Sequence, residues 1–595
     1  MKIRSLQQRV MMLLLLLSSM WALVFPEESI NSRTEEAAAV EPCPFMIIID
    51  GGSTGSRLHV FEFVYQIPKR VDTESQYAES EPERRLVLER RGSARADVPL
   101  SAFGPTREQP LVKATHVAAH LLPAFVQAAR IIPPRYHATT TVKYQATAGM
   151  RLLSDRDQQL VYDAMYDGLV ASPDFVFTAL QREDIQTLSG DLEGFYGAVA
   201  ANYLQGIVTT NLELVAHPDI DELQNKVVSH RPTGQIGALD MGGSSTQIVF
   251  LPTPTLDTAD VSSCTNPAVD ALEIDNKEDD VFDRGNVCHG STTTRLHGPD
   301  FFSTSYLSYG VDQFRERLWN TWVQQHDTER ANKNDETCDS KVIENPCAFA
   351  GYALEWDKYT LIGTGDAHRC VEEVQRLIPH PSEADLAKLG SHVGGVEHPP
   401  IRGKFLAMSL FFFALDSLRE LSRNHPQAHQ ALNESWPTPS IQELFDALEG
   451  LCSRSWHDDL VKIQHDAHAF TRAEVLPHRC LEAVYMVTLL RDGFGFAPES
   501  RDITFTFLVD GSEVEWTLGM ALVLRQEQQQ QHPVKGGPRA SACGDDSEGC
   551  STSSAHAPST DVQNRTNPNR PTVGKTFERS LRLEEWAKRL FSSIS

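Results

Sequence analysis

The residues from Gln235 to Phe250 read QIGALDMGGSSTQIVF, and they decide the fold of this chain. An apolar strand ends at the carboxylate of Asp240, a turn of glycine and serine follows, and a second apolar strand begins after Ser245. Glycines let backbone N–H groups approach an anion closely, hydroxyls donate to its oxygens, and a carboxylate can hold a cation that offsets its charge. The stretch therefore predicts a hairpin that cradles phosphate.

The same layout occurs earlier, in the residues FMIIIDGGSTGSRLHVF from Phe45 to Phe61, where Asp50 ends the first strand. A single turn of this kind is also the commonest hairpin signal. Two matching copies favour two related half-domains that face one phosphate chain. Neither copy is a Walker loop, because no Gly-Lys-Ser/Thr follows, and neither is a dinucleotide fingerprint, because a strand rather than a helix follows.

Length and charge narrow the function. A chain of 595 residues is long enough for two lobes of ordinary size and additional tails. The 80 acidic and 54 basic residues give a net charge of −26, which argues against binding of nucleic acid. An acidic protein with an anionic substrate needs local hydrogen-bond donors and a metal ion at its site.

The N-terminus carries a targeting signal. A basic start and an apolar run from Val10 to Phe25 predict a signal peptide or a retained type II signal anchor over residues 1–26. Both alternatives stay open, and residues 27–44 read as a stem. We find no second membrane segment in the sequence.

The cysteines favour an oxidising compartment. Ten cysteines contain no Cys-x-x-Cys pair and no zinc spacing, so we expect structural disulfides whose pairing the sequence leaves open. Cys338 and Cys347 are close enough to close a small loop. Asn433 and Asn564 begin glycosylation sequons, which matter only on the secretory route.

Between the two hairpins the pattern alternates between helices and strands. We expect helices over 111–130, interrupted at Pro123, and over 157–170, 405–423 and 480–492, and strands over 140–145 and 503–509. Residues 69–97 read as a solvated loop, and residues 206–234 and 253–300 as insertions. Residues 524–595 read as a low-complexity tail with an amphipathic helix at its end.

Five stretches, in order, resemble the apyrases, a family of nucleoside triphosphate diphosphohydrolases that includes Golgi nucleoside diphosphatases. They span about residues 45 to 523, and the ordered set is more specific than any one of its members. The stretches are DGGSTGSR from Asp50, ATAGMRLL from Ala146, EGFYG from Glu193 with ANYL from Ala201, DMGGSSTQ from Asp240, and WTLGMAL from Trp516.

The resemblance implies an α/β fold of two ribonuclease-H-like, actin-like lobes with the nucleotide in the cleft between them. By analogy the first lobe covers residues 45–188 and is completed by 503–523, and the second lobe covers 189–502.

The resemblance also implies site residues. Asp50 and Asp240 would hold Ca²⁺ or Mg²⁺ largely through waters, since these hard ions prefer oxygen ligands. Glu193 would be the general base, with Ser245 and Gln247 orienting the attacking water; the alternative for Glu193 and Asp191 is two carboxylates in the first turn of a helix, stabilised by its dipole. Trp516 would border the cleft, and Phe412 or Phe413 would stack on the base. The residues expected at the phosphates are Ser53, Thr54, Gly55, Ser56, Thr147, Gly242, Gly243, Ser244 and Ser245.

Departures from the family pattern bear on location. Gly51 stands where Ala is commoner in the family, and Ser244 stands where Ala or Gly is usual; both changes are small enough to keep the turns. Gly55 is the residue found in Golgi and plant members, which favours a Golgi-lumenal or secreted enzyme that acts on diphosphates such as GDP and UDP. Two alternatives remain: an exopolyphosphatase or kinase of the actin-like superfamily, and a non-catalytic nucleotide-binding secretory protein. The oligomeric state stays open.

Overall fold

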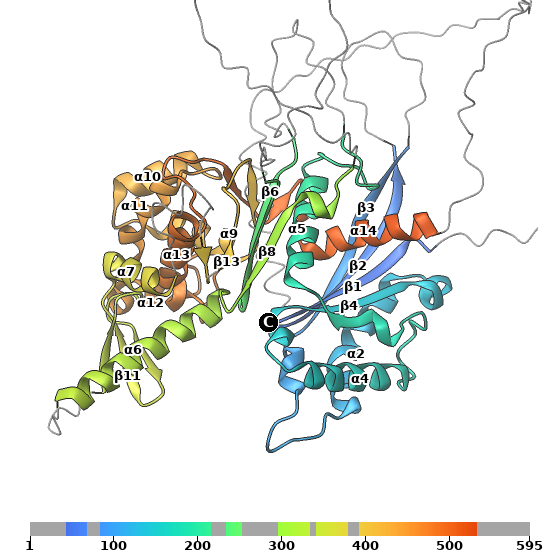
Figure 1. Ribbon diagram of the computed structural model, residues 1–595, viewed down its shortest axis with the longest axis horizontal. Helices are drawn as coiled ribbons and strands as arrows, with labels where there is room; N and C mark the ends of the chain where they lie inside the picture. The colour runs from blue at the N-terminus through green and yellow to red at the C-terminus, as the bar shows by residue number, and fades with distance from the viewer. Residues whose placement is uncertain are drawn as a thin grey trace, which may run out of the picture. The chain divides into compact units, whose positions relative to one another are not determined.

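Two glycine-containing hairpins stand at the centre of two separate sheets in the computed structural model of this chain (Figure 1). The structure describes residues 43–67, 84–215, 234–252, 295–333, 341–378, 392–394 and 396–531. The predicted leader and stem, the sequon at Asn564 and the tail beyond residue 531 lie outside these ranges.

The first sheet has five strands in the order β3-β2-β1-β4-β5. The neighbours β1 and β2, and β2 and β3, are antiparallel, whereas β1 and β4, and β4 and β5, are parallel. The central strand β1 buries every residue from Phe45 to Ile49, as expected for a strand covered on both faces. The strands are β1 (Phe45–Gly52), β2 (Gly55–Gln66), β3 (Arg85–Ala96), β4 (Thr141–Ala146) and β5 (Ile185–Thr187).

The second sheet repeats this topology, with the order β8-β7-β6-β14-β15 and the same alternation of antiparallel and parallel neighbours. Asp50 and Asp240 therefore lie on equivalent strands of two copies of one arrangement. The predicted α/β fold of two ribonuclease-H-like lobes is confirmed. The strands are β6 (Gly237–Met241), β7 (Ser245–Phe250), β8 (Phe302–Leu307), β14 (Phe405–Ala407) and β15 (Ile503–Phe505).

Helices cover both sheets. We call the part built on the first sheet the first lobe, and the part built on the second sheet the second lobe. The first lobe contains α2 (Ala114–Ile131), α3 (Ala148–Arg151), α4 (Asp155–Val170), η1 (Leu100–Phe103), η2 (Pro134–Thr139) and η3 (Arg182–Asp184). Pro123 lies inside α2, so the predicted interruption of this helix is wrong. The side chain of Ser154 caps α4 by accepting a hydrogen bond from the N–H of Asp157.

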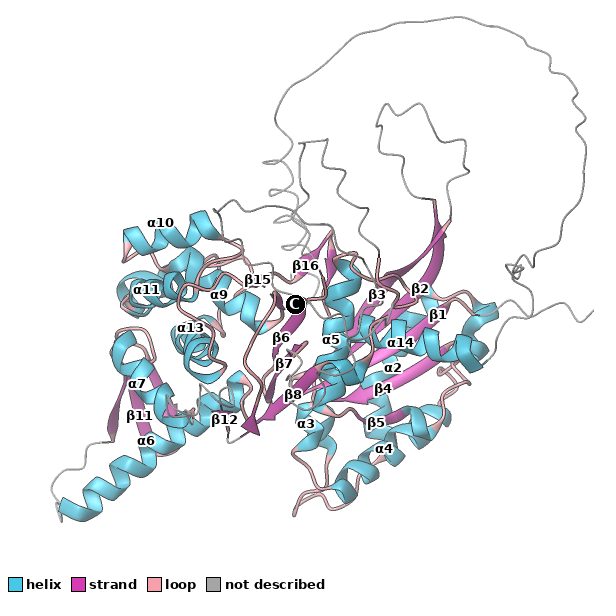
Figure 2. Ribbon diagram, turned by 45° about the horizontal axis from the view of Figure 1, so that its top comes forward, coloured by secondary structure: helices cyan, strands magenta, loops and turns pink. Residues whose placement is uncertain are grey.

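The second lobe adds a helical layer whose apolar side chains form one core with its sheet (Figure 2). Its helices are α6 (Val311–Lys333), α7 (Ala367–Leu377), α9 (Leu410–Leu421), α10 (Pro426–Ser435), α11 (Ile441–Cys452), α12 (Val461–Ile463), α13 (Arg479–Thr488), and the short turns η5 (Gly298–Asp300), η6 (Trp456–Leu460), η7 (Leu476–His478) and η8 (Leu489–Gly493). The small strands are β9 (Val342–Asn345), β10 (Ala353–Trp356), β11 (Tyr359–Gly363), β12 (His392–Val393), β13 (Val396–Glu397), β16 (Leu508–Val509) and β17 (Ser512–Glu513).

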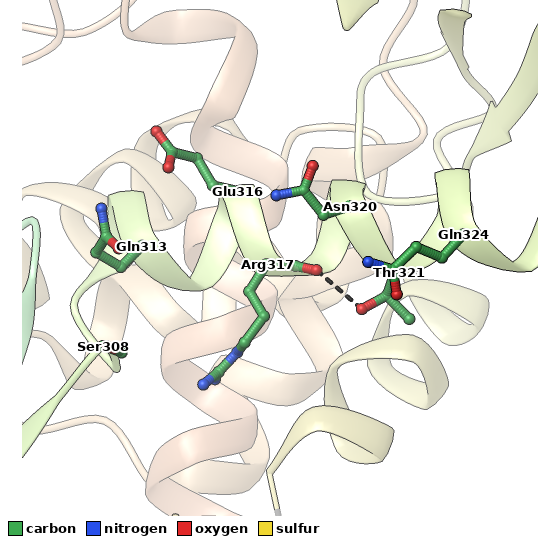
Figure 3. A pocket seen from close by; sticks show the side chains of 7 residues that line it. All are labelled: Ser308, Gln313, Glu316, Arg317, Asn320, Thr321 and Gln324. Atoms are coloured by element: carbon green, nitrogen blue, oxygen red, sulfur yellow. Dashed lines mark hydrogen bonds between the residues drawn. The ribbon is translucent and has the colours of Figure 1, made fainter. Parts of the chain in front are cut away.

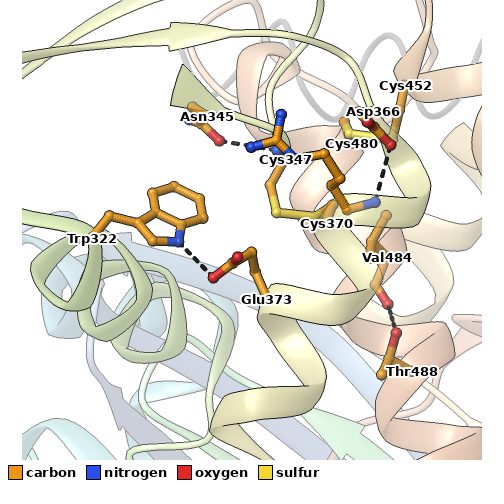
Figure 4. The surroundings of a disulfide bond; sticks show 11 residues. Trp322, Asn345, Cys347, Asp366, Cys370, Glu373, Cys452, Cys480, Val484 and Thr488 are labelled. Carbon is orange, nitrogen blue, oxygen red and sulfur yellow. Dashed lines mark hydrogen bonds between the residues drawn. A yellow bond between two sulfur atoms is a disulfide. The ribbon is translucent and has the colours of Figure 1, made fainter. Parts of the chain in front are cut away.

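Two disulfides link elements of the second lobe. Cys347, after β9, is bonded to Cys370 in α7, and Cys452 at the end of α11 is bonded to Cys480 in α13 (Figure 4). The expectation of structural disulfides is met within the described residues. The small loop expected between Cys338 and Cys347 does not form, because Cys347 pairs with Cys370.

Helices α5 (Gly190–Leu204) and α14 (Trp516–Gln531) pack side by side and connect the lobes (Figures 1 and 2). Helix α5 contacts β6, β7 and β8 of the second sheet, whereas α14 contacts β1 and β2 of the first. The approach is close at Gly519, where a Cβ would lie 1.9 Å from the carbonyl oxygen of Tyr196. Only glycine allows this crossing.

The structure corrects four expectations. Residues 85–96 form the edge strand β3 rather than a solvated loop, because ion pairs such as Arg91 with Glu62 satisfy its charges across the strands. Residues 405–407 form β14 rather than the first turn of a helix, since a short apolar run fits either structure. β15, predicted to complete the first lobe, pairs with β14 in the second sheet. Helix α14 continues through the glutamines to residue 531, inside the predicted tail.

No helix among the described residues has the length and hydropathy of a membrane span.

We expect Gly519→Ala to lower the free energy of unfolding by about 1–3 kcal/mol, the usual cost of overpacking a tight contact. The added methyl group meets backbone atoms of Tyr196, which cannot rotate away. Thermal and urea unfolding measure the change. Gly197→Ala in α5 is the matched control, because its Cβ would meet only the terminal methyl of Met408 at 3.6 Å. Equal stability of the two variants would contradict the close crossing.

Candidate active site

The first glycine turn is a two-residue connection between β1 and β2. Gly52 pairs with Gly55, which leaves Ser53 and Thr54 at the tip. Gly55 has a φ of +148°, and a Cβ there would lie 2.5 Å from the carbonyl oxygen of Ala96. The turn therefore requires glycine at this position and holds Ser53 and Thr54 beyond the ends of the strands.

The second turn, between β6 and β7, is fixed from behind by the start of α6. The N–H of Gly242 donates to the carbonyl oxygen of Ser245 at 2.9 Å, and the carbonyl oxygen of Gly243 accepts from the N–H of Asp312 at 2.9 Å. Gly310 packs against this turn, since a Cβ there would lie 2.3 Å from the nitrogen of Ser245. The turn is thus held rigidly.

The two turns meet. A Cβ on Gly243 would lie 2.8 Å from the hydroxyl oxygen of Ser53, which belongs to the other lobe. A Cβ on Gly149, in the short helix α3, would lie 2.9 Å from the Cα of Ser53. The three glycine-containing segments therefore converge on one point between the two sheets.

Three carboxylates lie close together at this point. Burial raises the pKa of Asp50 to about 7, although Arg57 opposes the shift, and the charges of Glu515 and Asp240 add to it. Burial also raises the pKa of Asp240. Atom Oδ1 of Asp50 is buried and has no hydrogen-bond partner among the described residues. The two predicted aspartates are therefore near enough for their charges to interact.

Glu193, in the first turn of α5, joins this group. Its side chain is 8% exposed, and burial raises its pKa to about 8. Arg151 opposes the shift, while the charges of Asp240 and Asp50 increase it. Nη2 of Arg151 forms an ion pair with the Glu193 carboxylate. Glu193 is therefore a buried carboxylate that forms an ion pair with the guanidinium of Arg151.

A second polar pair lies on β7. Nε2 of Gln247 donates to the hydroxyl of Ser245 at 3.0 Å, and both residues are buried. Gln247 is also the strand partner of Asp240. The predicted catalytic residues thus lie on two adjoining elements, α5 and β7, which contact each other.

Comparison with known proteins agrees with this geometry. A model of the GDA1/CD39 (nucleoside phosphatase) family matches residues 37–537. The chain belongs to that family.

Relatives in this family cover most of the chain. Ectonucleoside triphosphate diphosphohydrolase 1 of Mus musculus is 24% identical over 82% of this chain and 82% of its own length. The Golgi apyrase of Saccharomyces cerevisiae is 24% identical over 80% of this chain and 70% of its own length. Nucleoside-diphosphatase mig-23 of Caenorhabditis elegans is 23% identical over 80% of this chain and 75% of its own length.

Among solved structures, a nucleoside triphosphate hydrolase of Neospora caninum aligns with 82% of this chain and 93% of its own, at 14% identity and a TM-score of 0.49.

Not every predicted residue of this nucleoside phosphatase lies at the meeting point of the turns. The hydroxyl of Ser56 forms a hydrogen bond of 2.7 Å with the phenol hydroxyl of Tyr144, inside the first sheet. Thr147 directly precedes α3, and its N–H donates to the carbonyl oxygen of Gly51 at 3.0 Å, so it does adjoin the first turn. Trp516 is buried at the start of α14.

The predicted base-stacking residue Phe412 is 7% exposed and packs against other aromatic rings of the second lobe. Its four ring neighbours are Phe413, Trp436, Phe470 and Phe507. Stacking on a nucleobase stays a prediction for Phe412, and so do the individual roles assigned to the other site residues.

Two contacts near Glu193 did not follow from the sequence patterns. Arg151 forms an ion pair with the Glu193 carboxylate. Its place in the ATAGMRLL stretch is the signal that points to the site. Asp191 is now explained structurally, because its carboxylate accepts the N–H of Ser305 at 3.3 Å. No sequence motif points to Ser305, because the pairing of β8 with β7 is what brings it to the site.

Two other polar features lie apart from the predicted residues. A hollow of about 340 Å³ lies along α6. Figure 3 shows the residues that line it, which are Ser308, Gln313, Glu316, Arg317, Asn320, Thr321 and Gln324. The guanidinium carbon of Arg317 lies 4.4 Å from the centre of the Tyr309 ring. Asp416, Glu420 and His468 form a cluster with metal-ligand atom types, but Arg419 already binds both carboxylates of this cluster.

We expect Gly243→Ala to lower phosphate release from a nucleoside diphosphate by about 10²-fold, because a 1 Å displacement of positioned groups can reduce a rate by that factor. The added methyl group would meet Oδ2 of Asp312 at 2.4 Å and the hydroxyl of Ser53 at 2.8 Å. Gly298→Ala is the control, because its Cβ makes only an ordinary contact with Phe195 at 3.6 Å. Unchanged turnover in Gly243→Ala would show that the turns need not touch.

Proposed function

We propose that this chain hydrolyses the terminal phosphate of nucleoside di- and triphosphates in the secretory pathway, by attack of a water molecule with the help of a divalent cation. One observation carries the proposal: two phosphate-cradle turns from duplicated lobes meet beside three carboxylates, the buried Glu193 and the half-buried Asp50 and Asp240. The family of the chain and the names of its relatives support the same chemistry.

The aspartates fit a hard cation. Asp50 and Asp240 supply carboxylate oxygens, and the buried Oδ1 of Asp50 has no other partner among the described residues. Burying such a group without a partner is unfavourable, and a cation with its waters would satisfy it. When bound, Ca²⁺ or Mg²⁺ would offset the negative charge of the phosphates.

The turns fit the phosphates. Ser53 and Thr54 stand at the tip of the first turn, and the hydroxyl of Ser53 lies beside Gly243 of the second turn. Backbone N–H groups and hydroxyls in such turns donate to phosphate oxygens without adding bulk. Thr147 lies next to the first turn and would add a further hydroxyl.

Glu193 fits the role of the proton acceptor. Phosphoryl transfer requires mainly positioning and charge neutralisation, together with one group that takes the proton of the water. A carboxylate whose pKa burial raises to about 8 accepts a proton more readily than an ordinary one. Ser245 and Gln247, hydrogen-bonded to each other, would orient the water.

The lumen of the secretory pathway suits the chain. The disulfides Cys347–Cys370 and Cys452–Cys480 need an oxidising compartment. The sequon at Asn433 lies exposed on α10, where a glycan can be accommodated. We include a Golgi location in the proposal, with a preference for diphosphates such as GDP and UDP.

Release of phosphate from a panel of substrates tests the function. The panel contains nucleoside di- and triphosphates and inorganic polyphosphate, each with Ca²⁺, Mg²⁺ or chelator. We expect release from nucleotides that chelator abolishes, and we expect Glu193→Gln to lower turnover by about 10²–10⁴-fold with nucleotide binding retained. Glu499→Gln, on the surface, is the control. Release of phosphate from polyphosphate alone would contradict the proposed nucleotide substrate. Normal turnover in Glu193→Gln would contradict the role of Glu193 as the general base.

We expect the acid limb of the kcat/KM profile to follow the ionisation of Glu193, which must be deprotonated to accept a proton. Arg151 lowers the pKa of Glu193, so Arg151→Gln raises this pKa and moves the acid limb to higher pH. Rate profiles of the variant and the wild type between pH 5 and 9 measure the shift. Arg472→Gln, which removes an exposed cation elsewhere, should leave the profile in place. A shift to lower pH in Arg151→Gln would contradict the assignment.

A further inference from the structure

Ser305 lies at the centre of the polar contacts around Glu193, although no motif includes it. It belongs to β8, and its strand partner is Gln247. Its hydroxyl oxygen accepts a hydrogen bond from Nε2 of Gln247 at 3.1 Å and another from Nη1 of Arg151 at 3.2 Å. One hydroxyl therefore bridges a residue of the second sheet and a residue of the first lobe.

The bridge connects the two pairs that would act on the attacking water. Arg151 uses its other terminal nitrogen, Nη2, for the ion pair with Glu193. Gln247 uses the same Nε2 to donate to the hydroxyl of Ser245. Ser305 thus joins the side chain that holds Glu193 to the side chain that holds Ser245.

The surrounding structure is shaped for this bridge. A Cβ on Gly190 would lie 2.4 Å from the hydroxyl oxygen of Ser305 and 2.5 Å from Nη1 of Arg151, so glycine at this position makes room for both. The N–H of Ser305 donates to the carboxylate of Asp191, which fixes β8 to the first turn of α5. The position of Ser305 is therefore held from two sides.

The chemistry requires an acceptor at this position. A serine hydroxyl has two lone pairs and one proton, and here two donors occupy the lone pairs. Nε of Arg151 is already buried without a partner among the described residues. Without the oxygen of Ser305, Nη1 would lose its hydrogen bond as well, and Arg151 would no longer be held in one orientation.

The geometry points to Ser305 as a positioning residue for hydrolysis: its hydroxyl aligns the Arg151–Glu193 pair with the Ser245–Gln247 pair, so that both act on one water. This inference rests on the proposed function. Ser305 acts through its hydrogen bonds with Arg151 and Gln247.

Ser303 provides a matched control on the same strand. Its hydroxyl also contacts α5, by donating to the carbonyl oxygen of Asp191 at 2.6 Å. No hydrogen bond joins it to Arg151, Gln247 or Glu193 among the described residues. A purely structural role for serine hydroxyls between β8 and α5 predicts similar effects of removing either one.

The test compares Ser305→Ala and Ser305→Cys with Ser303→Ala. Cysteine fills nearly the same space as serine but accepts hydrogen bonds poorly, so Ser305→Cys separates the loss of the acceptor from the loss of packing. We expect kcat for nucleoside diphosphate to fall about 10–10²-fold in both Ser305 variants. KM, and the Kd of a non-hydrolysable nucleotide analogue, should stay within about 2-fold, because phosphate binding is untouched. Ser303→Ala should keep a kcat within about 2-fold of the wild type.

A pH profile adds a readout that strand packing alone would not change. The charged groups that act on Glu193 are Arg151 of α3, Asp50 of β1 and Asp240 of β6. If Ser305 holds Arg151 against Glu193, the acid limb of kcat/KM moves to higher pH in Ser305→Cys and stays in place in Ser303→Ala.

Normal kcat and an unshifted acid limb in folded Ser305→Cys would overturn the inference, and so would equal losses in Ser305→Cys and Ser303→Ala. Failure of the proposed function has a different signature, because the wild-type chain would then release no phosphate from nucleotides. Thermal unfolding of each variant shows that it is folded.

Discussion

The close approach of the two glycine turns is the constraint on which the site depends. Because Gly243 has no side chain, the hydroxyl of Ser53 occupies the space beside it, and the ends of two equivalent strands come together. The charges of Asp50, Asp240 and Glu193 interact here: desolvation raises all three pKa values, and this repulsion adds to the shifts of Asp50 and Glu193. Such a group of carboxylates favours a bound positive charge, which the divalent cation of the proposed function would supply.

The fold was largely readable from the sequence because it is duplicated. Two copies of an apolar strand ending in Asp, then glycine and serine, then a second apolar strand gave both hairpins and their equivalence. The edge strand β3 and the short strand β14 were not predicted from the sequence, for physical reasons. The sequence of β3 is rich in charges, which pair across neighbouring strands but resemble those of a solvated loop. The three apolar residues of β14 are too few to show the periodicity that separates a strand from a helix. The destination of β15 depends on long-range pairing, which local pattern does not encode.

The site was readable where the chain itself positions the residue. Asp50 and Asp240 lie near the ends of β1 and β6, and Glu193 lies in the first turn of α5, so their places in these elements followed from the motifs. Ser305 was not readable, because its role depends on register with Gln247. The duplication also hides a difference: Arg57 is the strand partner of Asp50, as Gln247 is of Asp240. Glu515 binds Arg57 at 2.9 Å, so the first lobe places an ion pair where the second places an amide.

The two described disulfides have a consequence for handling the protein. Both lie in the second lobe, where Cys347 follows strand β9 and the other three cysteines lie in α7, α11 and α13. In the glutathione-rich cytosol of an expression host, both described disulfides would stay reduced, and the second lobe would lose these cross-links. A host that exports the chain is therefore the appropriate source for biochemistry.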